Sequence, residues 1–369
     1  MTSAQIEVQL LAAVVAAACA LPGVFLVLRR MAMMSDAISH AILPGIVLGF
    51  FLTGRLDSPL LIAAAAAAGL VTVFLVEIIG RSRLVKEDAA IGLVFPALFS
   101  LGVILIARHA GGVHLDIDAV LLGEIAFAPF NRLSAEGLDL GPRALWTMGA
   151  MLAANAVFLG VFFKELKLAT FDPALAAALG FAPVALHYAL MALVSMTAVG
   201  AFDAVGSILV VALMIAPAAT ARLLTDRLGA MVAWSVGVGV ASAISGYWLA
   251  HALDASIAGA MATMTGVAFV VALVAAPRRG LVVLLHRRVT QRWTFAQQLL
   301  LIHLLNHEGS AEADEECRRA RLPYHLRWPP DFAARVVRRA ERLSLVTQRA
   351  EWIDLTPEGR ALAREALVR

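Results

Sequence analysis

Long apolar runs separated by short polar segments make up the first three quarters of the chain. A helix that crosses the hydrocarbon core of a bilayer needs about 20 consecutive, predominantly apolar residues. Nine runs approach or exceed this length, and we predict that each forms a membrane-spanning helix. The predicted spans are residues 8–28, 37–54, 59–80, 89–108, 144–163, 184–201, 204–221, 230–251 and 256–276.

Two regions interrupt this pattern. Asp203 lies between the sixth and seventh runs, beside Gly200 and Gly206. A polar, glycine-rich interruption of this kind predicts that one element there is broken or re-entrant. The segment 109–142 is more polar and contains Pro129. It predicts either an external loop or a partly buried half-helix.

After residue 277 the pattern changes from long apolar runs to shorter, amphipathic ones. The predicted elements are a basic connecting helix over 278–293, helices from Thr294 to Leu305 and from Asp331 to Ser344, β-strands at 345–347 and 352–355, and a last helix from Thr356. Helices followed by a small hairpin are the order of a winged helix-turn-helix. The predicted fold is therefore an all-α polytopic membrane bundle of about eight or nine transmembrane helices over residues 1–277, joined through 278–293 to a small α/β winged-helix domain over 294–369.

Composition agrees with this division. The chain is 61% hydrophobic and 15% charged, whereas soluble proteins average about 45–50% apolar and 25% charged residues. Residues 278–369 nevertheless hold 17 of the 30 Lys and Arg residues, so the tail is polar. Basic residues in short loops mark the cytoplasmic side of a membrane protein. If the spans alternate, that side carries Arg29, Arg81, Lys164 and Arg222, which predicts a multi-pass protein of the inner or plasma membrane with a cytoplasmic tail.

Asp36 and His40 lie near the start of the second predicted span. A charged side chain near the bilayer centre costs about 2.5–3.5 kcal/mol or more. The two residues are four positions apart, so they share one face of a helix. A carboxylate and an imidazole suit manganese, iron(II) and zinc, which suggests a path for a divalent cation. Two alternatives remain: Asp36 caps the helix, or His40 bonds a neighbouring backbone carbonyl.

Two other positions in the membrane part allow both a functional and a structural interpretation. Asp203 is a candidate ligand or gate residue, or a residue at the outer lipid–water boundary. Glu77 precedes Arg81 by four residues, which favours a local ion pair.

The loop at 164–183 is too polar to span the membrane. Asp172 followed by Pro173 predicts the start of a short helix, because Asp caps and Pro is favoured at the first helical position. Gly180 can end that helix. It is either an ordinary surface helix or a docking helix for a cytoplasmic motor.

Four stretches, taken in order, resemble the permease family of ABC transporters for zinc, manganese and iron(II). They are SDAISHAILPG at 35–45, EDAAIGLVFPALFSLGVIL at 87–105, KLATFDPALAAALG at 167–180 and VGSILVVALMIAPAATARLL at 205–224. The family usually has Gly before the Asp of the first stretch, where this chain has Ser35. The resemblance covers roughly residues 5–277.

The resemblance implies import of a divalent transition metal (Mn, Zn or Fe(II)) through a pore formed with a second permease, as a homodimer or heterodimer. It implies Asp36 and His40 as residues that contact the metal in the path. A separate ABC ATPase would dock on a coupling helix that includes Phe171, Asp172, Pro173, Ala177 and Gly180, and an extracytoplasmic metal-binding lipoprotein or periplasmic protein would deliver the ion. The tail resembles the winged-helix, metal-dependent-repressor extension of some family members.

The sequence argues against an enzyme with its own ATP site. It contains no GxxxxGK[ST] phosphate loop and has only three lysines, Lys86, Lys164 and Lys167. We therefore predict a transport subunit with no permanently bound cofactor. The alternatives are a membrane-anchored, metal-responsive transcription regulator and a metal channel or carrier that needs no ATPase.

The tail has two candidate activities. His303 and His307, four residues apart, could bind metal as a sensor together with Glu308 and Cys317, or be surface histidines on an ordinary helix. The Arg-rich helix from Asp331 resembles a DNA-recognition helix. Because a membrane tether restricts access to DNA, we favour a regulatory or protein-binding role and consider nucleic acid an unlikely partner.

Overall fold

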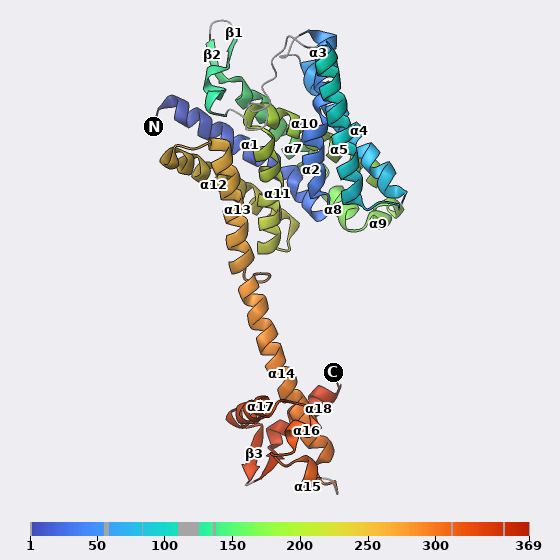
Figure 1. Ribbon diagram of the computed structural model, residues 1–369, viewed down its shortest axis with the longest axis vertical. Coiled ribbons are helices and arrows are strands. Elements are labelled where there is room, and N and C mark those ends of the chain that lie inside the picture. The colour runs from blue at the N-terminus through green and yellow to red at the C-terminus, as the bar shows by residue number, and fades with distance from the viewer. Residues whose placement is uncertain are drawn as a thin grey trace. The chain divides into compact units, whose positions relative to one another are not determined.

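The computed structural model describes residues 2–54, 59–82, 84–109, 125–135, 138–310, 313–349 and 351–368. It forms two compact units, Met1–Gly280 and Leu281–Arg369. The first unit is a helical bundle and the second a small mixed unit (Figure 1).

The described part of the first unit is almost entirely helical. Its helices are α1 (Ser3–Leu28), α2 (Ala32–Ala41), α3 (Leu43–Thr53), α4 (Pro59–Arg81), α5 (Glu87–His109), α7 (Arg143–Val161), α8 (Phe163–Phe171), α9 (Pro173–Ala178), α10 (Pro183–Val205), α11 (Ser207–Leu224), α12 (Leu228–Leu253) and α13 (Ile257–Ala275). A 3₁₀ helix, η1 (Ile125–Phe130), precedes the antiparallel hairpin of β1 (Arg132–Ala135) and β2 (Leu138–Pro142).

Among the described residues, nine helical segments are long and apolar enough to cross a membrane, as the sequence predicted. The second begins at Ala32, five residues before its predicted start, and consists of α2 and α3 in succession. The sixth and seventh are separate helices that meet at Gly206, whose φ of +80° permits the abrupt change of direction. Of the segment 109–142, residues 110–124 lie outside the described residues.

Helix α1 lies at the centre of the bundle and packs against α7, α10, α11 and α12. Close approach depends on small residues: a Cβ on Gly23 would lie 2.0 Å from the carbonyl oxygen of Met214 in α11. Buried polar side chains add bonds between helices. Nδ2 of Asn155 donates to the carbonyl of Ala18 at 3.0 Å and to Thr197 at 2.9 Å, which joins α7 to α1 and α10.

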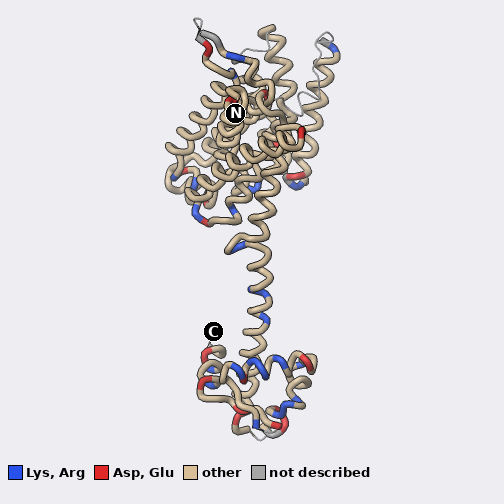
Figure 2. Tube along the Cα trace, turned by 90° about the vertical axis from the view of Figure 1, so that its left-hand side faces the viewer, with Lys and Arg blue, Asp and Glu red and all other residues tan. Residues whose placement is uncertain are grey.

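The two ends of the bundle differ in charge and structure. The β1–β2 hairpin lies at one end and the short helices α8 and α9 at the other (Figure 1). More of the blue Lys and Arg segments of this unit lie at the α8–α9 end (Figure 2). At the hairpin end, Arg132 bonds Asp139 at 2.6 Å and Glu7 of α1 at 3.0 Å, which fastens the hairpin to the bundle.

The second unit has its own hydrophobic core, in which Leu300, Leu304, Val336 and Ile353 are buried. Its elements are α14 (Leu281–His307), α15 (Ala313–Glu316), α16 (Leu322–His325), α17 (Pro330–Arg342), the antiparallel strands β3 (Val346–Arg349) and β4 (Trp352–Leu355), and α18 (Pro357–Val368). The prediction that a helix begins at Thr294 is wrong, because α14 runs through this position without a break. The Thr294 hydroxyl donates to the carbonyl of Thr290 instead of capping a helix.

Candidate functional site

Asp36 and His40 face each other within α2. Nε2 of His40 lies 3.4 Å from Oδ1 of Asp36, and the side chains are 29% and 35% exposed. Because α2 begins at Ala32, Asp36 is inside the helix and cannot be its N-cap. The capping alternative is therefore wrong.

A short interruption at Ile42 follows this pair. Helix α2 ends at Ala41 and α3 begins at Leu43, with Pro44 in its first turn. Proline has no N–H, so the carbonyl of His40 loses its usual partner four residues ahead. Ile42 keeps a right-handed helical backbone, so α2 and α3 together form one candidate span over Ala32–Thr53. The ring of Phe95 in α5 packs against His40, with 5.9 Å between ring centroids.

Asp203 does not join this pair in any group of three potential ligands. It lies in the last turn of α10 and is exposed. A metal ion is commonly held by three or more His, Cys, Asp or Glu side chains. In the part of the chain that the structure describes, such a group lies in the second unit. Asp36 and His40 are thus a pair of potential ligands in the described part of the first unit.

The predicted helix of the 164–183 loop is present as α9. Oδ1 of Asp172 accepts from the backbone N–H of Leu175 at 2.9 Å, Pro173 takes the first position, and Gly180 has a φ of +86° just beyond the end. Ala176 is buried. Around it lie exposed apolar side chains: Phe171, Leu175, Leu179, Phe181 and Val184. This apolar surface around α9 is what a partner protein could cover.

A polar network connects the α8–α9 end to the spanning helices. Glu77 of α4 lies 2.5 Å from Nε2 of His187 and accepts from the hydroxyl of Tyr188 at 2.8 Å, both on α10. Arg29, just after α1, contacts Nδ1 of His187 at 3.0 Å and donates to Thr170 of α8 at 3.2 Å. The network thereby joins α1, α4, α8 and α10.

Sequence reasoning found only one part of this network. The predicted pair of Glu77 and Arg81 is confirmed at 3.4 Å. The contacts to Arg29, His187 and Tyr188 were missed, because they join residues more than a hundred positions apart. The presence of an imidazole and a phenol at the start of the apolar run after Pro183 was the available signal.

In the second unit, His303 and His307 come together with Glu316, and their potential ligand atoms lie within 4.8 Å of one another. His325 also reaches Glu316, with 2.9 Å between Nδ1 and Oε2. Glu308, a predicted member of this group, instead pairs with Arg360 at 2.5 Å. Burial raises the pKa of the Cys317 thiol, which disfavours the thiolate that binds metals.

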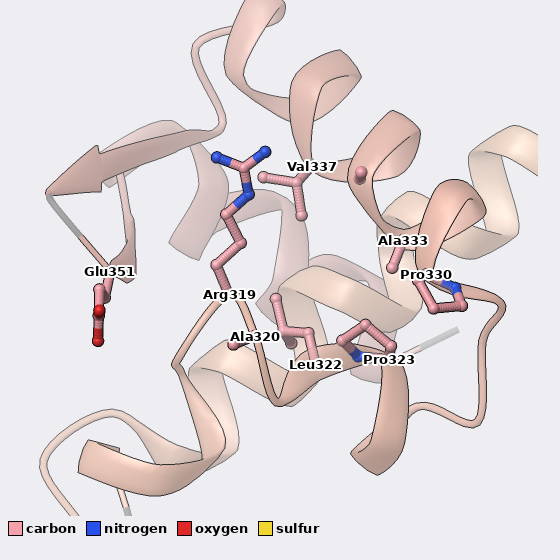
Figure 3. A pocket seen from close by; sticks show the side chains of 9 residues that line it. Arg319, Ala320, Leu322, Pro323, Pro330, Ala333, Val337 and Glu351 are labelled. Carbon is pink, nitrogen blue, oxygen red and sulfur yellow. The ribbon is translucent and has the colours of Figure 1, made fainter.

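A separate groove of about 470 Å³ lies between α17 and the segment around α16 (Figure 3). Ala333 and Val337 of α17 face it from one side and Pro323 from the other. Its ionisable lining residues are Arg319 and Glu351. With one carboxylate and one guanidinium at its edge, this groove lacks the donors of a metal site.

Comparison with known proteins finds a matching family and similar transport proteins. The model of a family described as the ABC 3 transport family matches residues 2–276. The chain is 48% identical over 365 residues to the zinc transport system membrane protein TroD of Treponema pallidum, covering 98% of both chains. It is 48% identical over 268 residues to the manganese transport system membrane protein MntD of Bacillus subtilis, covering 73% of this chain and 90% of the relative.

A solved structure with the same architecture is PsaBC from Streptococcus pneumoniae in complex with Fab. Its similarity to this chain has a TM-score of 0.64 at 29% identity and covers 76% of this chain and 94% of that one. The similarity therefore extends over the membrane bundle as a whole.

Proposed function

The chain belongs to the ABC 3 transport family, and we propose that it is the membrane-spanning permease subunit of an importer for a divalent transition metal, Mn²⁺ or Zn²⁺. The names of the relatives given above include both zinc and manganese transport. The resemblance also implied Fe(II), which has the same ligand preferences and stays a prediction. The observation that carries the proposal is the Asp36–His40 pair within a candidate membrane span, Ala32–Thr53.

The geometry of this pair suits a transported ion. Bonds of about 2.0–2.2 Å to one tetrahedral ion place its ligand atoms about 3.3–3.6 Å apart. Nε2 of His40 and Oδ1 of Asp36 are 3.4 Å apart, so both could bind one ion without moving. Two side chains hold an ion more weakly than a closed four-ligand site, which permits release.

A second permease copy would complete the path. The pair is about one third exposed, so another copy or a related permease chain packed against α2 and α3 could supply a second set of donors. We propose a homodimer or heterodimer on this basis. We propose that Asp203, which is exposed in the last turn of α10, lies at the end of the path and is not a third ligand.

We propose that the α8–α9 end faces the cytoplasm. The concentration of Lys and Arg at this end supports the orientation. The apolar surface around α9 would then receive a separate ABC ATPase, and the Arg29–His187–Glu77 network would pass its movement to α1 and α4. An extracytoplasmic metal-binding protein would deliver the ion at the end that carries the β1–β2 hairpin.

We further propose that the second unit is a cytoplasmic, winged-helix-like regulatory module. The order of α15, α16 and α17 followed by a hairpin and α18 supports this. Two arginines of α17, Arg335 and Arg339, lie over the ring of Trp293 at 5.8 and 5.6 Å, and this contact supports a structural role for them.

Uptake of labelled metal tests the transport function. Cells that carry the chain with its ATPase are expected to accumulate Mn²⁺ or Zn²⁺, and Asp36→Ala or His40→Ala is expected to reduce the initial rate at least tenfold. His251→Ala, at an exposed histidine on α12, serves as the control and is expected to retain uptake. Normal uptake by both Asp36 and His40 variants would contradict the proposal. Uptake that persists when the ATPase is disabled would instead indicate a channel or carrier.

A further inference from the structure

The imidazole cluster of the second unit has the donors of a metal site that lies outside the transport path. His303, His307 and Glu316 each offer one ligand atom, and these atoms lie within 4.8 Å of one another. Ligand atoms around one tetrahedral ion stand about 3.3–3.6 Å apart. A contraction of about 1 Å would therefore bring all three onto a single ion.

The fold brings these residues together from three helices. His303 and His307 share one face in the last two turns of α14, with 4.8 Å between their ring centroids. Glu316 is the last residue of α15 and His325 the last of α16. The backbone carbonyl of Glu316 lies 3.2 Å from Nε2 of His303, which fixes α15 against α14.

His325 supports the Glu316 carboxylate. Its Nδ1 lies 2.9 Å from an oxygen of that carboxylate. A neutral imidazole carries a single N–H, and with this N–H on Nδ1 the ring donates a hydrogen bond to Glu316. A hydrogen bond of this kind, from a residue outside the ligand set, orients a carboxylate that binds a metal.

The charge around Glu316 differs from that around its neighbours. Glu315 pairs with Arg321 at 3.0 Å and Glu308 with Arg360. In the described tail, the carboxylate of Glu316 instead contacts two imidazoles. Nε2 of His303 lies 3.6 Å from its Oε2 and Nδ1 of His325 lies 2.9 Å from the same oxygen. A carboxylate among imidazoles is the environment in which zinc is commonly held.

We propose that His303, His307 and Glu316 form a binding site for one divalent transition-metal ion of the Zn²⁺ class, with His325 holding the Glu316 carboxylate. Two nitrogens and one carboxylate oxygen fill three of the four positions around a tetrahedral ion, and they favour Zn²⁺ over the harder Mg²⁺ and Ca²⁺. The ion would join the ends of α14 and α15, and His325 would connect α16 to them through Glu316.

Cobalt binding tests this site in the full chain. Co²⁺ is the probe, because its tetrahedral complexes absorb visible light and it accepts the same ligands. The metal-stripped chain, purified in detergent, carries Asp36→Ala and His40→Ala so that the transport pair contributes nothing. This background is expected to bind about one equivalent of Co²⁺. Adding His303→Ala with His307→Ala is expected to abolish the absorption, whereas His286→Ala, at an exposed histidine on the same helix, is expected to leave it unchanged.

A conservative variant guards against loss of folding. Glu316→Gln preserves the shape of the side chain and is expected to weaken Co²⁺ binding at least tenfold, while resistance of the tail to limited proteolysis stays unchanged. The site is overturned if the double alanine variant binds Co²⁺ like the His286→Ala control. It is also overturned if the double variant loses binding only because its tail is digested while Glu316→Gln binds normally. Neither result bears on uptake, so this proposal and the transport function can fail separately.

Discussion

At the scale of single residues, the polar groups within the bundle serve two purposes. Asn155 is 1% exposed, and its amide NH₂ donates hydrogen bonds to two other helices. Asp36 and His40 are about one third exposed and contact each other. A group that only held helices together would be buried like Asn155. The exposure of the pair leaves space for an ion and for ligands from another molecule.

The Glu77 network leads to a prediction about stability. Glu77→Gln removes the negative charge that His187, Tyr188 and Arg81 contact. It also leaves the positive charge of the partly buried Arg29 farther from a carboxylate. Since removing one partner of a buried ionic group is costly, we expect a loss of about 1–3 kcal/mol. We expect the midpoint temperature of thermal aggregation to fall for the purified protein in detergent. We also expect slower metal uptake by cells that carry the variant.

Arg81→Gln is the matched control within the same network. The Arg81 side chain is 72% exposed, whereas Glu77 is 19% exposed. An exposed ion pair contributes about 0–1 kcal/mol, so the midpoint should change little. Equal losses for the two variants would mean that Glu77 has no role beyond its pair with Arg81.

Sequence reasoning found residues that are close along the chain and missed those that meet through folding. Asp36 and His40, and likewise His303 and His307, were identified because a spacing of four places them on one helix face. Glu316 and His325 were missed, because α15 and α16 return to α14 only when the core of the second unit forms. Glu308 was wrongly included, since Arg360, 52 residues away, binds it.

At the scale of elements, apolar run length predicted the spans well and local chemistry predicted their ends less well. The second span was expected to begin after Asp36, because Asp is a good helix cap, but packing extends α2 back to Ala32. Thr294 was expected to start a helix, yet no Gly or Pro lies between Leu281 and His307 to interrupt α14. For α9 the local signals of Asp172, Pro173 and Gly180 agreed, and the helix is as predicted.

The exposed face of α9 yields a prediction about the ATPase. Leu175 is 45% exposed and Leu179 60% exposed. Replacing both with serine removes apolar area that would be buried by a docked partner, at about 25 cal/mol per Å². We expect the ATPase subunit to co-purify with the permease at least tenfold less, while the permease itself stays stable.

Tyr324→Ser is the control, because Tyr324 is 80% exposed in the second unit and has no place in the proposed coupling surface. It should retain the ATPase. If the Leu175 and Leu179 variant also retains the ATPase and transports metal normally, α9 is an ordinary surface helix.

At the scale of the whole molecule, the chain combines a permease-like bundle with a unit of different composition. The family match ends at residue 276, close to the boundary of the first unit at Gly280. The similarity to TroD continues through the tail, over 365 residues. The sequence similarity therefore includes the second unit. If this unit is cytoplasmic, as we propose, its metal site would be exposed to the imported ion.

This arrangement predicts feedback of imported metal on transport. When the internal metal concentration rises, the site of His303, His307 and Glu316 would fill and tie together the ends of α14 and α15, with α16 connected through the contact of His325 with Glu316. We expect uptake by the unmodified transporter to fall as cells are preloaded with Zn²⁺, and uptake by the His303→Ala and His307→Ala variant to fall less, with at least a threefold higher concentration at half-inhibition. His286→Ala should follow the unmodified curve. If the purified chain binds Co²⁺ at this site but the inhibition curves of all three proteins are identical, the bound metal has a purely structural role in the second unit.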